Sequence, residues 1–237
     1  MKVQFKGKIA KESAYNSDNE DALSCSPTKG VAVISDGASE SFDAKNWSTI
    51  LVNRYQMNQD FNARWLKITI NSYKRKFNSQ ELNWSRQAAY NRGSYASLLG
   101  VVEVNPTKSL DVFSIGDSLA VLLRNNQLVD TFPYKNSVEF NQHPELVSTI
   151  FSNNSYLFED NFFEKHRVSW PIDVNTTVLL MTDALGAWSL RNNEKKNEVW
   201  TTLSNVKHKK DLLEIVEYER QEKTMRVDDS TLIVLTF

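Results

Sequence analysis

The sequence predicts an α+β fold, a layered sandwich of mostly antiparallel strands with helices packed against them. Eight short stretches have strand-like composition, and the tight Asn125-Asn126 turn joins two of them. Three amphipathic helices lie between groups of strands and do not alternate with single strands, which disfavours a doubly wound parallel sheet. The 237 residues contain no repeat and no Pro/Gly/Ser-rich linker, so we expect a single domain, 1–237.

The strand candidates are apolar or β-branched runs bounded by turn residues. They are residues 3–10, 30–35, 98–104, 110–115, 119–124, 127–132, 177–182 and 231–237. The run 178–181 is apolar on both faces, which predicts a buried central strand. Because asparagine tolerates positive φ, the Asn125-Asn126 pair predicts an antiparallel hairpin.

Apolar residues at 3.6-residue spacing predict three helices. The first covers residues 41–55, with Ser39 or Ser41 as its N-cap. The second lies around residues 79–93 and stops at Gly93. The third covers residues 211–222 and starts at an aspartate. We expect the lysine-bearing segments 191–197 and 205–210 to be surface loops, and segments 132–144 and 152–171 to form either a lid or plain loops.

The composition excludes several classes of function. Lys+Arg 28 against Asp+Glu 29 gives a net charge of -1, so no overall basic field would attract nucleic acid or an anionic membrane. No segment resembles a signal peptide or approaches the ~20 apolar residues of a membrane span. The single cysteine, Cys25, fits a reducing compartment. We therefore expect a cytoplasmic protein that binds neither nucleic acid nor membrane.

Aspartates stand at strand ends or beside turns in five places. They are Asp21, Asp36, Asp117, Asp183 and the pair Asp228 and Asp229. Most of them, taken singly, are also explained by an ordinary turn or by a solvated surface. Asp183 is less easily explained in this way, because the end of a buried strand is an unfavourable place for a carboxylate without a role.

If these strand ends converge, several carboxylates share one pocket. Two like charges ~4 Å apart repel by several kcal/mol at an effective dielectric constant of about 20, so such a cluster needs cations. Oxygen ligands without a Cys/His set favour Mg²⁺ or Mn²⁺ over zinc. Two such ions would activate a water and bind a phosphate, which indicates phosphoester hydrolysis.

In their order along the chain, the acidic segments resemble the motifs of the type 2C metal-dependent serine/threonine protein phosphatases, especially the compact bacterial members. The matching segments are NED (19–21), SDGAS (35–39), YASLLG (95–100), IGDS (115–118), MTDALGAW (181–188) and DDSTLIVL (228–235). They span nearly the whole chain. Several motifs in the family's order are far more specific than any one of them.

The resemblance implies a four-layer α-β-β-α sandwich with a binuclear Mn²⁺ or Mg²⁺ centre between its two sheets. In this arrangement Asp36 would bridge the two metals and the Gly37 carbonyl would bind one of them. Asp183 and Asp228 would bind the other.

The resemblance also gives roles to three further acids. Asp21, with Glu20, would hold water molecules of the metal centre, and Asp117 would bind a third, weaker metal together with Asp183. The implied catalytic residues are Asp21 and Asp36. The implied reaction is hydrolysis of phosphoserine or phosphothreonine in a phosphorylated protein substrate by a metal-activated water, without a phosphoenzyme. We expect a monomer.

The chain departs from the family's pattern at several positions. Five residues before Asp21, where relatives carry an arginine that binds the substrate phosphate, stands Asn16, and an amide cannot replace a guanidinium. Leu119 stands where an arginine often follows the GDS turn, Ala184 replaces a glycine, and residues 38–39 replace a more glycine-rich continuation. No implied metal ligand is lost. Two alternatives stay open: a weakly active or inactive module that binds phosphoproteins, and a phosphatase of small molecules.

Other hydrolytic chemistries lack their residues. Six positions after Cys25 stands Val31, where a cysteine-dependent phosphatase needs arginine. His143, His166 and His208 are far apart in the sequence, and we expect each to pack or to lie on the surface. The sequence has no Ser/His/Asp signature and no phosphate-binding P-loop.

Overall fold

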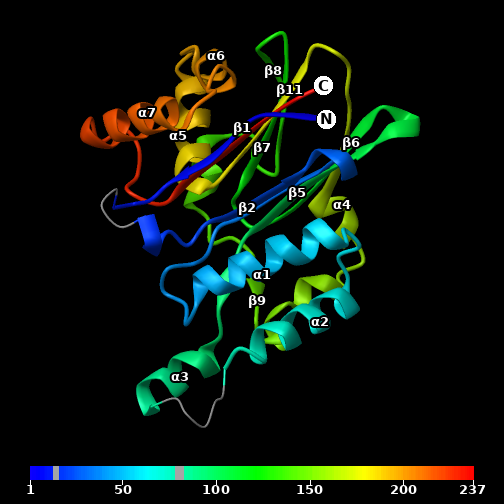
Figure 1. Ribbon diagram of the computed structural model, residues 1–237, viewed down its shortest axis with the longest axis vertical. Coiled ribbons are helices and arrows are strands. Elements are labelled where there is room, and N and C mark those ends of the chain that lie inside the picture. The colour runs from blue at the N-terminus through cyan, green and yellow to red at the C-terminus, as the bar shows by residue number, and fades with distance from the viewer. Residues whose placement is uncertain (13–15, 78–82) are drawn as a thin grey trace.

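The computed structural model describes residues 1–12, 16–77 and 83–237, which form two face-to-face sheets flanked by helices (Figure 1). The first sheet contains, in spatial order, β1 (Lys2–Ile9), β12 (Ser230–Thr236), β11 (Thr176–Met181), β7 (Leu119–Arg124) and β8 (Gln127–Phe132). The second contains β10 (Arg167–Pro171), β6 (Ser109–Ile115), β5 (Leu98–Val104), β3 (Val31–Ser35) and β2 (Ala22–Ser26). We call them sheet A and sheet B. Neighbouring strands in both sheets are antiparallel.

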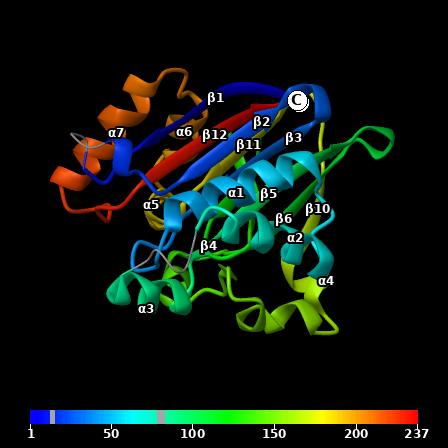
Figure 2. The same cartoon turned by 60° about the horizontal axis from the view of Figure 1, so that its bottom comes forward.

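Helices cover the outer face of each sheet (Figures 1 and 2). α1 (Ala44–Met57) lies on sheet B with α2 (Ala63–Lys74) beside it, while α5 (Asp183–Glu194), α6 (Val199–Ser204) and α7 (Lys209–Gln221) cover sheet A. α4 (Phe162–His166) leads into β10, and α3 (Trp84–Arg92) stands away from the layers with none of its side chains buried. A small sheet pairs β4 (Tyr95–Ala96) with β9 (Val147–Ser148). Short 3₁₀ helices cover Asn16–Asp18, Pro27–Lys29, Asn105–Thr107, Ser137–Asn141, Phe151–Asn153 and Ser155–Phe158.

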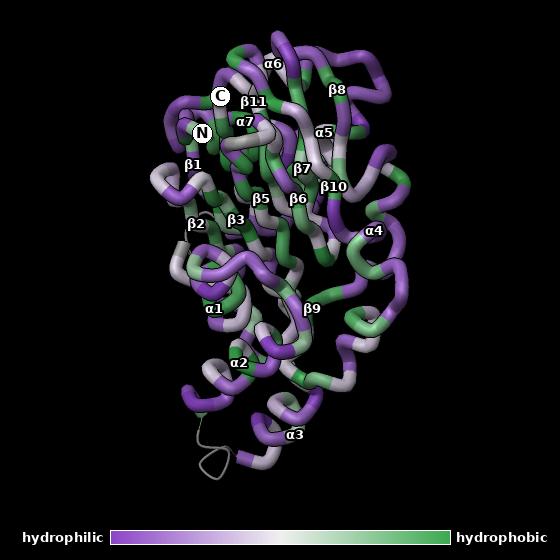
Figure 3. The backbone as a smooth tube through the Cα atoms, turned by 90° about the vertical axis from the view of Figure 1, so that its right-hand side faces the viewer, coloured by the Kyte–Doolittle hydropathy of each residue, from purple (hydrophilic) through white to green (hydrophobic). Residues whose placement is uncertain are grey.

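Apolar side chains fill the space between the sheets and the space under the helices on either side. In β11, Val178 and Leu180 point between the sheets, whereas Leu179 and Met181 point toward the helices on sheet A. The central strands β5 and β7 accordingly carry long hydrophobic stretches in Figure 3, where α3 is mainly hydrophilic. This order of layers confirms the expected α-β-β-α sandwich of two antiparallel sheets flanked by helices.

All eight predicted strands are present, with ends within one residue of the prediction. The Asn125-Asn126 hairpin is confirmed as well, because both residues have positive φ (51° and 61°) and join β7 to β8. β2 and β10 are strands that the sequence analysis does not predict. Both lie at the edges of sheet B and are partly exposed, so polar residues interrupt their apolar pattern.

The predicted helices need correction at their starts. α1 begins at Ala44 with Asp43 as N-cap, so neither Ser39 nor Ser41 caps it. The second predicted helix starts among residues that lie outside the described part of the chain, but α3 does stop at Gly93, which has φ +88°. α7 begins at Lys209 with His208 as N-cap.

α2, α4, α5 and α6 are helices that the sequence analysis does not predict, and α4 and β10 lie in the segment 152–171, where the sequence analysis expects a lid or a plain loop. Most of the first eight residues of α5 are buried, so the helix is apolar nearly all round and lacks a two-faced pattern. Residues 191–194 therefore belong to α5 and not to a surface loop, and Lys209 and Lys210 belong to α7. No helix of the described residues has the length and apolar character needed to cross a membrane.

Candidate metal centre

The turn after β3 is fixed by buried hydroxyl groups. The Asp36 backbone N–H donates to Ser97 Oγ (3.0 Å), and the Ser97 N–H donates back to the Asp36 carbonyl (2.8 Å). Ser35 Oγ donates to the Ser97 carbonyl (2.5 Å), and Ser97 Oγ also bonds to Ser118 Oγ (2.8 Å). These bonds hold the SDG, YASL and GDS segments together, so the position of Asp36 is set by two other motifs.

Gly37 is a glycine because α1 begins directly against it. A Cβ on Gly37 would lie 2.9 Å from the backbone C and O atoms and from the Cβ of Ala44. No side chain fits at this distance without moving the helix. The structure thus gives the Asp-Gly pair a packing reason that is independent of any ligand role for the Gly37 carbonyl.

Four of the predicted aspartates line one cavity of about 210 Å³: Asp36, Asp117, Asp183 and Asp228. They come from both sheets. Asp36 follows β3 of sheet B, and Asp117 lies in the turn that leads from β6 of sheet B to β7 of sheet A. Asp183 is the first residue of α5, directly after β11, and Asp228 precedes β12. The cavity therefore lies where strand ends of the two sheets meet.

Burial and mutual repulsion disfavour the charged form of these acids. Burial raises the pKa of Asp36 well above its usual range, and the neighbouring Asp21, Asp117 and Asp228 carboxylates raise it further. Burial likewise raises the pKa of Asp117, with Arg226 opposing the rise and Asp228 adding to it. A cluster with these properties gains stability from any cation that it binds.

Asp21 lies beside Asp36 and is buried, with 1% of its surface exposed. Its Oδ2 accepts hydrogen bonds from Thr231 Oγ1 (2.6 Å) and Thr182 Oγ1 (3.1 Å), which both belong to the sheet A side. Among the described residues its Oδ1 has no hydrogen-bond partner. Burial raises the pKa of Asp21 to about 7.

Glu20, like Asp21, does not line the cavity. Its Oε2 accepts hydrogen bonds from Ser39 Oγ and from Lys11 Nζ (3.2 Å). Its backbone N–H donates to Asp229 Oδ2 (2.6 Å), and Asp229 Oδ1 accepts from the Lys11 N–H (2.7 Å). Asp229 is thus a structural residue, which ties the N-terminal segment to the start of β12.

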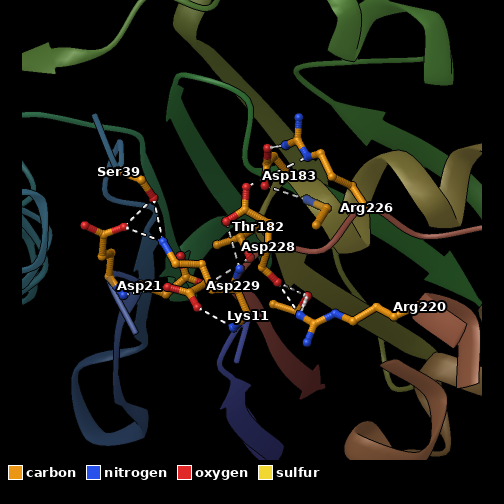
Figure 4. Close-up of polar contacts among 12 residues, drawn as sticks. Lys11, Asp21, Ser39, Thr182, Asp183, Arg220, Arg226, Asp228 and Asp229 are labelled. Carbon is orange, nitrogen blue, oxygen red and sulfur yellow. Dashed lines mark hydrogen bonds and ion pairs between the residues drawn. The ribbon is translucent and has the colours of Figure 1, made fainter. Parts of the chain in front are cut away.

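Sequence reasoning did not single out Arg226, a basic residue that reaches these acids. Its Nη2 forms an ion pair with Asp183 Oδ2, and its Nε lies 3.8 Å from Asp228 Oδ2 (Figure 4). The only sequence signal was its place two residues before Asp228. The side chain of Asn16 lies outside the described part of the structure.

Solved structures of phosphatases resemble this chain over nearly its full length. The serine/threonine phosphatase PstP/Ppp of Mycobacterium tuberculosis has a TM-score of 0.58 at 13% identity, with 98% of each chain covered. The serine/threonine phosphatase Stp1 from Staphylococcus aureus has a TM-score of 0.60 at 14% identity, with 100% of this chain and 96% of that chain covered. The chain has the type 2C phosphatase fold.

A third solved structure that is similar to this chain is PppA, a key regulatory component of T6SS in Pseudomonas aeruginosa. Its TM-score is 0.50 at 18% identity, with 92% of this chain and 91% of that chain covered. No protein-family model and no curated protein sequence matches the chain. The likeness to the type 2C phosphatases is therefore one of fold.

The donor set of this type 2C fold suits hard cations, although its side chains are not arranged around one. Within the described residues, no three Asp, Glu, His or Cys side chains stand in a geometry that would hold a metal ion. Instead, Arg226 supplies positive charge to Asp183 and Asp228. Among the described residues Asp21 Oδ1 has no hydrogen-bond partner, and the raised pKa of Asp36 shows that the metal-free cluster disfavours a further negative charge. Carboxylate oxygens of this kind fit Mn²⁺ or Mg²⁺.

The thiol and imidazole groups do not take part in this site. Burial raises the pKa of the Cys25 thiol to about 11, which makes it a poor nucleophile. His166 is buried and donates from Nδ1 to the Ser114 carbonyl (2.7 Å), and His143 is exposed. Each histidine thus packs, caps a helix or lies on the surface, as expected.

Proposed function

We propose that the protein is a metal-dependent phosphatase of phosphoserine and phosphothreonine in proteins. The observation that carries this proposal is the convergence of Asp36, Asp117, Asp183 and Asp228 on one cavity between the sheets of a type 2C fold. Four carboxylates in one small cavity are costly without cations, so a purely structural role does not explain them.

The metal-binding residues would be those around the cavity. Asp36, the Gly37 carbonyl, Asp183 and Asp228 would hold two Mn²⁺ or Mg²⁺ ions, and Asp117 a third. Bound metal would lower the pKa of water and neutralise the phosphate of the substrate. The closely spaced carboxyl groups make the cluster an acceptor of such ions.

Asp21 would handle the proton of the attacking water. Its Oδ2 is held by Thr182 and Thr231, so the orientation of the carboxyl group is fixed and its Oδ1 remains without a partner among the described residues. A carboxylate held in this way would accept the proton of the water through Oδ1.

A polypeptide substrate is supported by a second hollow of about 640 Å³ beside the acidic cavity. Ala38 and Leu146 line both, so the two lie side by side. The second hollow adds apolar side chains of Phe42 and Ile150 and the basic Arg92, which suit the residues that flank a phosphorylated serine or threonine. We propose that the protein acts on such substrates as a cytoplasmic monomer.

The second candidate function is a weakly active or inactive module that binds phosphoproteins. The contact that favours it is the ion pair of Arg226 with Asp183, because a metal must displace the guanidinium before it can bind there. The amide at Asn16 in place of a guanidinium favours it too.

Hydrolysis of p-nitrophenyl phosphate and of a phosphothreonine peptide, with Mn²⁺ and with EDTA, tests the proposal. Turnover that requires Mn²⁺, disappears in Asp36→Asn and Asp183→Asn and survives in the exposed control Asp160→Asn would support the phosphatase. A silent wild type whose melting temperature still rises with Mn²⁺ would support the binding module. Turnover that persists in EDTA or in Asp36→Asn would refute a metal-dependent reaction at this site.

A further inference from the structure

Among the described residues, the basic side chains that pair with acidic side chains around the cavity include Lys11 and Arg226. Lys11 Nζ donates hydrogen bonds to Glu20 Oε2 (3.2 Å) and Ser39 Oγ (3.0 Å), so its charge is already paired with the Glu20 carboxylate. Arg226 is different, because it reaches the carboxylates of the cavity itself. A phosphate group that enters this cavity is repelled by the aspartates and needs such a charge close by.

Arg226 contacts two carboxylates of the cavity from the surface. Its side chain is 59% exposed, whereas the side chain of its partner Asp183 is only 9% exposed. Nη2 pairs with Asp183 Oδ2, and Nε lies 3.8 Å from Asp228 Oδ2. The guanidinium therefore serves as the counter-charge of two carboxylates, those of Asp183 and Asp228 (Figure 4).

The backbone on either side of Arg226 is fixed. Met225 is buried against the helices on sheet A. After Arg226, the Asp228 carbonyl accepts a hydrogen bond from Arg220, which also donates to the Ala10 carbonyl (2.9 Å). The side chain of Arg226 is exposed and long, so it can change its direction while its Cα stays in place.

A divalent cation and the Arg226 guanidinium compete for the same oxygens. When a cation binds Asp183 and Asp228, Arg226 loses its partners, but its N–H donors stay at the mouth of the cavity. A guanidinium presents parallel donors that match two oxygens of a phosphate group, which a lysine ammonium does not.

We propose that Arg226 binds the substrate phosphate after a divalent cation has displaced it from Asp183 and Asp228. The proposal rests on the proposed function and deepens it. Arg226 then supplies the guanidinium that position 16 lacks. The same residue makes metal binding less favourable, because each cation must first break the ion pair.

Isothermal calorimetry with Mn²⁺ alone tests the competition, on the full chain after removal of metal. The variants are Arg226→Gln, Arg226→Lys and a matched control, Arg64→Gln, which removes the same charge from an exposed position of α2. We expect Arg226→Gln to bind Mn²⁺ roughly 3- to 10-fold more tightly than wild type, since no ion pair has to be broken. Arg64→Gln should bind as wild type does.

Titration of the Mn²⁺-loaded proteins with inorganic phosphate tests the new role. We expect Arg226→Gln to bind phosphate about 10-fold more weakly, Arg226→Lys to lose part of the affinity, and Arg64→Gln to lose none. With the phosphothreonine peptide, KM should rise by a similar factor in Arg226→Gln while kcat changes less. An Arg226→Gln variant that binds phosphate as tightly as Arg64→Gln overturns the proposal.

The two proposals fail in different ways. If the wild type binds Mn²⁺ and phosphate but hydrolyses neither substrate, the phosphatase proposal fails, while weaker phosphate binding by Arg226→Gln still supports the role of Arg226. If the wild type is an active phosphatase and Arg226→Gln has unchanged phosphate affinity and KM, only the role of Arg226 is refuted.

Discussion

Replacing Asp36 by asparagine should stabilise the metal-free protein while it abolishes metal binding. Burial and three neighbouring carboxylates raise the pKa of Asp36, so ionisation of this group destabilises the folded state. Asparagine has nearly the same shape and no charge. Its amide can also donate a hydrogen bond toward Asp21 Oδ1, which has no partner among the described residues.

The size of the effect follows from the charges. Two carboxylates about 4 Å apart repel by about 4 kcal/mol at an effective dielectric constant of about 20, and partial protonation relieves some of this. We therefore expect Asp36→Asn to raise the free energy of unfolding by about 1–3 kcal/mol at pH 8. For a chain of this length that corresponds to a rise in melting temperature of roughly 5 °C.

The effect should depend on pH in a definite direction. A carboxyl group whose pKa is raised by folding costs nothing below its unfolded pKa of about 4 and destabilises the protein increasingly as the pH rises through its folded pKa. Metal-free wild type should therefore lose stability from about pH 4 upward, and Asp36→Asn should lose less.

Thermal unfolding in EDTA between pH 4 and pH 8 measures this difference, with the exposed Asp160→Asn as control. Addition of Mn²⁺ should reverse the order, because ligand binding stabilises only a protein that can bind. If Asp36→Asn melts below wild type in EDTA at pH 8, or if the two proteins show the same pH dependence, charge repulsion does not destabilise the metal-free cluster.

Three further predictions concern the surroundings of the site. Gly37→Ala should lower the free energy of unfolding by about 1–3 kcal/mol, because the new Cβ meets the Ala44 backbone at 2.9 Å; chemical denaturation measures this, and unchanged stability would show that α1 moves freely. Arg220→Ala should cost about 1–3 kcal/mol and weaken Mn²⁺ binding, because the bond to the Asp228 carbonyl is lost; calorimetry that shows wild-type Mn²⁺ affinity would contradict this. Burial lowers the pKa of His166, so the stability that its neutral form provides should be lost as the pH falls below about 6.5; denaturation at several pH values should show this slope in wild type and not in His166→Gln.

The strands are predictable because their signal is local. Apolar runs such as 119–124 and 178–181 are buried on both faces, and the Asn125-Asn126 turn marks one hairpin without ambiguity. The edge strands β2 and β10 are not predictable from the sequence, because solvent faces one side of each strand and polar residues are tolerated there. α5 is missed for the opposite reason, because its surroundings bury nearly all of its faces.

The acidic cluster is predictable in part. The order of the motifs along the chain predicts that Asp36, Asp117, Asp183 and Asp228 come together, and the cavity contains all four. The position of Arg226 is not predictable in this way, because nothing in its local sequence shows that the side chain turns back toward Asp183. Such contacts depend on where a loop folds and not on residue spacing.

The hydrogen bonds of Asp21 bear on how sequences of distant relatives should be judged. Its carboxylate joins the start of β2 in sheet B to Thr182 and Thr231 on the side of sheet A, so it holds the two halves of the sandwich together at this end. A relative that had lost all catalysis would still be selected to keep this aspartate for its architecture. The backbone of Asp36, in contrast, is bonded to Ser97 on the sheet B side. Loss of Asp36 in a distant relative would therefore be an earlier and more reliable sign of lost catalytic activity than loss of Asp21.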